Sequence, residues 1–457
     1  MGFDQLDFWE AAFVFGLIAL IGWETWQAFS SRSWVSAYRP TLFVAVILSY
    51  YCLLGPLRAL AGEEGAVFRG LDHSGVLLWG WAGGFVFYVC LLIGFYTFSQ
   101  KCTPHRLILK VNPDQLHRLG LRLCQLGLLM FSLVTGTRVL ALINPLAAYQ
   151  LTQQGGFGQE GLDVGAFVNY FNSGINFLIP GICLMMAAWL RWRKRTASLL
   201  LWIVATAGIY TSLGFRWRLV LLLVPLILLW FMARQQRPSL GLLAFFTAGL
   251  ITLGGLIGIS RNYGRGLDLG ALEDTATVDY FEQGFTEATT FFTTAGVMEQ
   301  APVRSPFIGP APLMATILFP IPRALFPGKP DASYITDATA QLYGGANLAM
   351  GSAFLNYAEY YLIAGWPSLV GLSLLLGWLL RRLWNWFLLR QDEPFAQCVY
   401  LISSSFLYVV ISRGYLPQVI LLFVFTVAPL FWLYRRIARP VDTSHVRPAP
   451  PVSSHIP

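Results

Sequence analysis

Eleven long runs of apolar residues constrain this chain more than any other feature of its sequence. Each run holds between 17 and 24 residues, which is enough for one helix to cross a hydrocarbon core about 30 Å thick. Because lipid offers the backbone no hydrogen-bond partner, the runs are expected to be helices. The predicted spans are 8–29, 42–60, 75–98, 123–143, 167–190, 197–213, 217–233, 240–260, 360–380, 395–412 and 416–434.

Two of these runs have only 17 residues, which is the lower limit for a span, so the predicted count is about eleven within a range of ten to twelve. Only 12% of the residues are charged, about half the share that is usual in a soluble protein. We therefore predict an all-α, polytopic integral membrane protein in which residues 1–457 form a single transmembrane domain.

Lysine and arginine predict the orientation of this domain. Loops on one side of the predicted spans hold 20 of the 31 Lys and Arg residues, and such loops stay in the cytoplasm. This places the N-terminus outside and the C-terminus inside. The net charge of +8 is then a belt on the inner face rather than a surface for nucleic acid. The cytoplasmic segments are 30–40, 101–122, 191–196, 234–238, 381–394 and the tail from 435.

One external segment, residues 261–359, is much longer than the other loops, and a long structured loop in a compact protein is usually functional. Its second part, FIGPAPLMATILFPIPRALFPGKP (307–330), is apolar but contains six prolines. Proline interrupts a spanning helix, so this part is predicted to be a short helix, re-entrant or lying on the outer leaflet. The tail 440–457 is rich in Pro and Ser and is predicted to be disordered.

Six arginines lie at the external ends of spans or in the long loop, where Lys and Arg are uncommon. Because the guanidinium fork binds phosphate through two hydrogen bonds, their convergence predicts a site for a pyrophosphate lipid in the outer leaflet. Snorkelling to the interface is the alternative for some of the six. Residues two apart point to different sides of a helix, so Arg216 and Arg218 are not expected to face one site together. The six are Arg138, Arg216, Arg218, Arg261, Arg323 and Arg413.

Four short motifs follow one another between residues 214 and 417. An arginine opens an apolar span in GFRWRLVLLLVPLIL, and the long loop later contains FPIPRALFPGKP (319–330). GSAFLNYAEYYLIAGWPSLVG (351–371) leads into the ninth span, and ISRGYLP (411–417) precedes the last one. In order and spacing these motifs resemble those of the O-antigen polymerases of the Wzy type, whereas the first half of the chain is similar to them only in hydropathy.

The resemblance implies an enzyme of surface-polysaccharide synthesis in the bacterial inner membrane. Such enzymes polymerise oligosaccharide repeat units carried on undecaprenyl diphosphate, at the outer face of that membrane, into O-antigen or exopolysaccharide. The fold that it implies is similar to the glycosyltransferase C class. No cofactor or metal is expected. The implied partners are the lipid-linked oligosaccharide, membrane lipid, a chain-length regulator and a flippase, with no nucleic acid.

The chemistry requires groups that neutralise the leaving diphosphate and a general base for the attacking sugar hydroxyl. Glu359, at the entry of the ninth span, is the first candidate for the base, and Asp331, just after the proline-rich motif, is the second. The alternative role of Glu359 is an interfacial ion pair with an arginine. Lys329 joins the six arginines as a predicted diphosphate ligand. The predicted sugar-binding residues are Asn356, Tyr357 and Tyr360.

Two other functions remain open on the sequence. The related O-antigen ligases use a histidine of a periplasmic loop, but the long loop here has none, and only His73 lies outside by the predicted topology. A flippase or other transporter of lipid-linked oligosaccharide also has many spans, but it usually shows inverted repeats and charges near the midplane. The sequence shows no repeat, and its external arginines lie at the rim, so a polymerase is favoured over both.

The predicted orientation can be tested by labelling introduced cysteines in intact cells. A cysteine in 268–347 should react with a membrane-impermeant maleimide, whereas one in 191–195 should react only after lysis, both measured above the signal of the native cysteines. Labelling of the long loop only after lysis would reverse the orientation and move the candidate site to the other face of the membrane.

Overall fold

The computed structural model describes residues 5–62, 65–97, 112–153, 167–259, 261–262, 266–268, 270, 280–322, 325–329, 333–345 and 353–437. Within these ranges the chain is almost entirely helical, apart from two short antiparallel strand pairs. Nine helical stretches of the described part are long and apolar enough to cross a membrane: Phe8–Ser30, Pro40–Leu60, Ser74–Thr97, Pro113–Ile143, Val168–Trp192, Arg216–Ala233, Leu240–Ile259, Pro394–Ser412 and Leu416–Ile437. The chain is an all-α polytopic membrane protein, which confirms this part of the prediction.

The two other predicted spans form helices that differ from these nine. The run at 197–213 forms α10 (Thr196–Ser212), an apolar helix of 17 residues. The run at 360–380 is divided at Gly365, where a φ of 73° separates α19 (Asn356–Ala364) from α20 (Trp366–Leu388). The 23 residues of α20 include Arg381 and Arg382. The number of eleven spans therefore stays a prediction.

The first half of the chain forms α1 (Phe8–Ser30), η2 (Trp34–Tyr38), α2 (Pro40–Leu48), η3 (Ser49–Leu54), α3 (Gly55–Leu60), β1 (Val67–Phe68), β2 (Leu71–Asp72), η4 (Ser74–Val76), α4 (Leu77–Thr97), α5 (Pro113–Thr135), η5 (Gly136–Arg138), α6 (Val139–Ile143), α7 (Pro145–Gln153), α8 (Val168–Ser173), η7 (Gly174–Phe177), α9 (Leu178–Trp192) and α10. The second half forms α11 (Arg216–Ala233), α12 (Leu240–Ile259), β3 (Arg261–Asn262), β4 (Gly266–Leu267), α14 (Tyr280–Gln283), η8 (Gly284–Thr289), α15 (Thr290–Gln300), α16 (Ala311–Leu318), α17 (Tyr334–Tyr343), α19, α20, α21 (Pro394–Ser405), α22 (Leu407–Ser412), α23 (Leu416–Thr426) and α24 (Ala428–Ile437).

The fourth span differs from its predicted bounds of 123–143. Its helix α5 begins ten residues earlier, at Pro113, because Pro suits the first turn of a helix and the Asn112 side chain accepts a hydrogen bond from the Asp114 N–H. The helix ends where Gly136 adopts a φ of 62°. Arg138 therefore lies on the short helix η5, within the stretch Pro113–Ile143 but after the end of α5.

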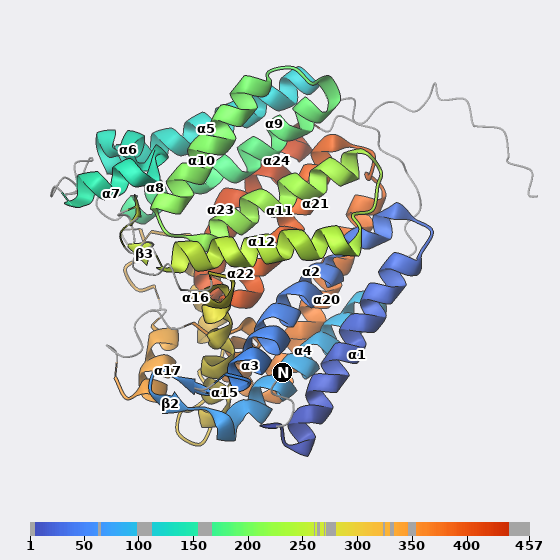
Figure 1. Cartoon of the computed structure of the whole chain (residues 1–457), viewed down its shortest axis with the longest axis vertical. Helices are drawn as coiled ribbons and strands as arrows, with labels where there is room; N and C mark the ends of the chain where they lie inside the picture. Colours follow the sequence, from blue (N-terminus) through green and yellow to red (C-terminus); the bar gives the residue numbers. More distant parts are fainter. Residues whose placement is uncertain are drawn as a thin grey trace, which may run out of the picture.

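Two groups of packed helices make up the membrane domain (Figure 1). One group contains α1, α2, α4 and α20, and the other contains α5, α9, α10 and α11. Glycine permits the closest approaches, because Gly94 of α4 faces the Leu374 carbonyl and Gly377 of α20 faces the Leu91 carbonyl. Small residues of this kind let helices associate in lipid through backbone contact.

The elements of segment 261–359 gather at one side of these groups, where α15 and α17 lie near β2 (Figure 1). The sequence did not lead us to expect α15, which is almost completely buried against α3, α4 and α19. In the proline-rich part, α16 packs on α23 but leaves Ile317 74% exposed. The prediction that this part is re-entrant or interfacial remains untested, and the predicted disordered tail lies outside the described residues.

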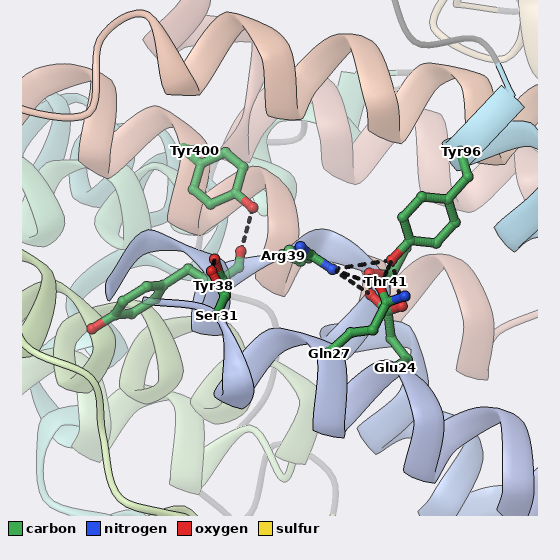
Figure 2. Close-up of polar contacts among 9 residues, drawn as sticks. Glu24, Gln27, Ser31, Tyr38, Arg39, Thr41, Tyr96 and Tyr400 are labelled. Carbon is green, nitrogen blue, oxygen red and sulfur yellow. Dashed lines mark hydrogen bonds and ion pairs between the residues drawn. The ribbon is translucent and has the colours of Figure 1, made fainter. Parts of the chain in front are cut away.

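A polar cluster at the opposite end of the first group attaches α1 to its neighbours (Figure 2). Glu24 of α1 is fully buried and accepts hydrogen bonds from Thr41 of α2 and, at 2.5 Å, from the Tyr96 hydroxyl of α4. Arg39 lies 3.9 Å from the same carboxylate and donates to the Tyr96 hydroxyl at 3.1 Å. A buried carboxylate is tolerated when it is paired and hydrogen-bonded in this way, so Glu24 is accounted for as an attachment point of α1.

This attachment predicts a specific loss of stability. Thr41→Val removes one donor to the buried Glu24 carboxylate, and an unsatisfied buried acceptor costs about 1–3 kcal/mol. Thr252→Val is the matched control, because the exposed Thr252 hydroxyl bonds only to the Ala248 carbonyl of its own helix. Unfolding by SDS titration of the purified protein should show a lower free energy of unfolding for the first variant alone. Equal stability of both variants would show that the cluster does not hold α1.

Candidate functional site

Arg216 begins α11, directly after a turn in which Gly214 adopts a φ of 69°. Its side chain extends over the glycine face of α12, where a methyl group on Gly258 would overlap the guanidinium atom Nη2. The guanidinium is nine-tenths buried. Its Nε and Nη1 atoms have no hydrogen-bond partner within the described residues. A buried donor without a partner requires an explanation, and one explanation is a ligand.

Glu287, on η8, is the acidic residue nearest to this guanidinium. Its Oε1 lies 3.5 Å from Arg216 Nε, which is close enough for an ion pair but long for a hydrogen bond. Its Oε2 accepts a hydrogen bond of 3.2 Å from the Tyr408 hydroxyl, which lies 3.2 Å from the Tyr51 hydroxyl. The sequence analysis did not single out Glu287, because no local motif links it with Arg216 or Tyr408.

A small cavity of about 110 Å³ contains Arg216 and Arg413 together, with Glu287 and Gln418 in its lining. Arg413 directly follows α22 and is half-buried. No carboxylate of the described chain lies within ion-pair distance of Arg413. Two arginines from segments about 200 residues apart in the sequence therefore meet at one cavity, and within the described residues only Arg216 has an acidic partner.

A larger cavity of about 680 Å³ shares Arg216 and Glu287 with the small one. Its lining is mostly apolar and comes from α1, α2, α11 and α12. It extends from Phe29 and Pro238, near the ends of α1 and α11, to Arg58 and Arg216 at the opposite ends of their helices. The arrangement can hold a long apolar chain with an anionic group at the end where the arginines lie.

Glu359 lies in α19, ahead of the 23-residue helix α20, and has no exposed surface. The Tyr334 hydroxyl donates to its Oε1, and the Leu416 N–H donates to Oε1 at 3.0 Å and to Oε2 at 3.2 Å. Burial raises the pKa of Glu359 to about 7, and the two donors oppose this rise. It makes no ion pair with an arginine of the described residues, so the alternative role as an arginine partner finds no support here.

Segments from three of the four motifs lie next to one another around Glu359. The Gly414 N–H donates to the Phe354 carbonyl at 2.7 Å, which joins the turn after Arg413 to the start of α19. The ring of Tyr415 lies 6.0 Å from that of Tyr334 and 6.3 Å from that of Phe319. The short turn 413–416 therefore connects the two candidate groups, because Arg413 begins the turn and the Leu416 N–H at its end binds Glu359.

The three predicted sugar-binding residues are buried. The Tyr357 hydroxyl donates to the Gly80 carbonyl at 3.0 Å, and the Tyr360 ring lies 6.4 Å from Phe87, so both tyrosines pack in the core. Their positions do not favour contact with a sugar. Asn356 has no exposed surface, and its amide oxygen and nitrogen have no hydrogen-bond partner among the described residues. Of the three, Asn356 is the one with unused hydrogen-bonding groups.

Three other predicted diphosphate ligands line neither cavity. Arg218 is buried, donates to Asn176 at 3.1 Å and lies 4.3 Å from the Phe215 ring, as expected for a residue that points away from the side of Arg216. Lys329 donates to two backbone carbonyls of its own segment. Arg138 is half-buried on η5 and lines neither cavity.

Three predicted site residues cannot be placed. Arg323 and Asp331 lie outside the described residues, and Arg261 is described only in its backbone, which pairs with Leu267. His73, on which the ligase alternative depends, is 2% exposed, and its ring lies 5.9 Å from that of Phe292. This buried histidine does not favour a ligase.

Comparison of the chain with protein-family models, with characterised proteins and with solved structures finds no match.

Proposed function

We propose that this protein polymerises undecaprenyl-diphosphate-linked oligosaccharide repeat units at the outer face of a bacterial inner membrane. The observation that carries the proposal is the meeting of Arg216 and Arg413 at one small cavity that adjoins a large apolar one. Such a pair of cavities suits a lipid diphosphate, with its chain among α1, α2, α11 and α12. The glycosyltransferase C class remains the fold that we propose by resemblance.

The proposed reaction transfers a growing glycan from its lipid to the next unit. A hydroxyl oxygen of the acceptor sugar forms a bond to the anomeric carbon of the donor, and the bond from that carbon to the diphosphate oxygen breaks. The electron pair of the broken bond stays on undecaprenyl diphosphate, and the hydroxyl proton passes to a general base. Arg216 and Arg413 stabilise the charge that grows on the diphosphate, a role that needs no proton transfer.

Glu359 is the proposed general base, and its raised pKa suits the removal of a proton near neutral pH. Both of its oxygens accept hydrogen bonds from the protein. The base must therefore become accessible when the acceptor binds, by movement of α17, which carries Tyr334, or of the turn 413–416. Asp331 stays the second candidate on sequence grounds alone.

If Arg216 and Arg413 bind the diphosphate through their guanidinium groups, the positive charge of a lysine in their place is not sufficient for polymerisation. Arg216→Lys and Arg413→Lys should each lower the rate of polymerisation about 100-fold, the size of effect seen when one donor to a developing anion is lost. The exposed Arg304 of the same external segment offers the matched control Arg304→Lys, which should have little effect. The measurement is chain length on gels after incubation with a synthetic lipid-linked repeat unit. Full-length polymer from both test variants would exclude this site.

A glycine substitution tests the position of the Arg216 guanidinium without changing the charge of the site. Gly258→Ala places a methyl group against Arg216 Nη2 and should displace the guanidinium, whereas Gly249→Ala on the same helix meets no atom within 4 Å. Polymerisation should therefore fall in the first variant and stay unchanged in the second. Equal activity of the two alanine variants would mean that polymerisation does not depend on the position of the Arg216 side chain against α12.

The base role of Glu359 can be separated from its structural role. In Glu359→Gln the amide oxygen can still accept the Leu416 N–H, so the fold should be retained, but the side chain cannot take up a proton. Polymerisation should fall by about 10²–10⁴-fold, the usual contribution of a general base, with the melting temperature nearly unchanged. Glu299→Gln in α15 is the control. Long polymer from Glu359→Gln, or a loss of melting temperature that explains the defect, would exclude Glu359 as the base.

A further inference from the structure

In the described part of the chain, Arg216 and Glu287 are the two charged residues that line both cavities. Glu287 therefore stands where a phosphate bound by Arg216 would also stand. A carboxylate and a phosphate carry the same sign of charge and seek the same donors, so both cannot approach one guanidinium closely without repulsion. The proposed function leaves this acidic residue without a part in the reaction.

Arg216 and Glu287 form a loose ion pair without a direct hydrogen bond. The separation of 3.5 Å between Glu287 Oε1 and Arg216 Nε leaves Nε and Nη1 without a hydrogen bond, although both atoms are buried. Glu287 is in turn held from the other side by the Tyr408 hydroxyl. The guanidinium is thus held in position by Glu287, but two of its nitrogen atoms have no hydrogen bond within the described residues.

We infer that Glu287 is a built-in competitor for the anion at Arg216 and that it limits how tightly the site holds a lipid diphosphate. The inference rests on the proposed function. A polymerase must release undecaprenyl diphosphate after each transfer, and a site with two uncompensated arginines would bind this product strongly. Glu287 returns to Arg216 as the product leaves, so the site is never left with a bare buried charge. Glu287 is in this sense a positioning residue, since it acts through Arg216.

Binding measurements on the purified full-length protein in detergent micelles test the inference. The probes are undecaprenyl diphosphate, inorganic pyrophosphate and undecaprenol. Glu287→Gln keeps the shape of the side chain and an acceptor for Tyr408 but removes the charge. It should lower the Kd for undecaprenyl diphosphate about tenfold or more and leave the Kd for undecaprenol unchanged. A similar gain with pyrophosphate would show that the diphosphate group alone is the competing anion, and a gain with the lipid alone would show that the chain is needed to bring it there.

The matched control is Glu299→Gln, since Glu299 lies on α15 and lines neither cavity. It should leave the Kd unchanged. Tyr408→Phe is a second test variant, because it keeps the charge but frees the carboxylate from one of its contacts. It should raise the Kd for undecaprenyl diphosphate, because a carboxylate with one donor fewer pairs more closely with Arg216. In steady-state polymerisation Glu287→Gln should lower both KM and kcat, because product leaves more slowly.

The opposite result has a clear meaning. If Glu287 only supports Arg216, its replacement should weaken binding of undecaprenyl diphosphate and raise KM, and unchanged or weaker binding overturns the inference. The proposed function fails separately, when the unaltered protein binds undecaprenyl diphosphate no better than undecaprenol, or when Arg216→Ala does not reduce that binding. In those cases Glu287 has no diphosphate to compete with, and the inference falls as well.

Discussion

Arg216 places a guanidinium where an apolar cavity ends, and the surrounding elements are arranged to make this tolerable. A buried charge is costly unless a partner and hydrogen bonds compensate for it. The partner comes from η8, which must therefore lie against α12. That close packing depends on small residues, because Gly255 faces the Tyr280 carbonyl and Gly284 faces the Ile251 carbonyl. The need to compensate one arginine thus explains why part of segment 261–359 is packed into the membrane domain rather than exposed beside it.

A second buried charge links the candidate base to the same region. Glu359 can be buried because Tyr334 and the Leu416 N–H satisfy its carboxylate. The bond to Leu416 fixes the first residue of α23, and the Gly414–Phe354 backbone bond fixes the turn just before it. Arg413 precedes both contacts by one to three residues. Its position in the small cavity is therefore set by the same interactions that hold Glu359, so that a movement which frees the carboxylate would also move one of the two arginines.

The sequence predicts the parts of this structure that depend on local pattern. Apolar runs locate the helices because the bilayer requires both apolar side chains and internal backbone bonding, and the spacing of Arg216 and Arg218 predicts that they diverge. Pairings over long sequence distances have no such local signal. Glu287 lies 71 residues from Arg216 and 121 from Tyr408, and its role follows only from the packing of η8. Tyr357 is an example of a local pattern that does not show the side-chain environment. Its place near Glu359 in the sequence suggested a sugar contact, whereas its hydroxyl donates to the Gly80 carbonyl in the core.

The distribution of charge along the large cavity bears on the choice between an enzyme and a flippase. Among the described residues, its lining contains three charged ones, Arg58, Arg216 and Glu287, all at one end, and the rest of that lining is apolar apart from a few hydroxyl groups. The cluster around Glu24 and Arg39, near the other end of α1, is occupied by its own hydrogen bonds. Carrying a diphosphate across the membrane would require polar or charged groups along the path, since an anion in an apolar passage pays the cost of desolvation at every point. A lining of this kind instead suits a lipid whose chain is held in the cavity while its head group stays at one face, which favours chemistry at that face over transport.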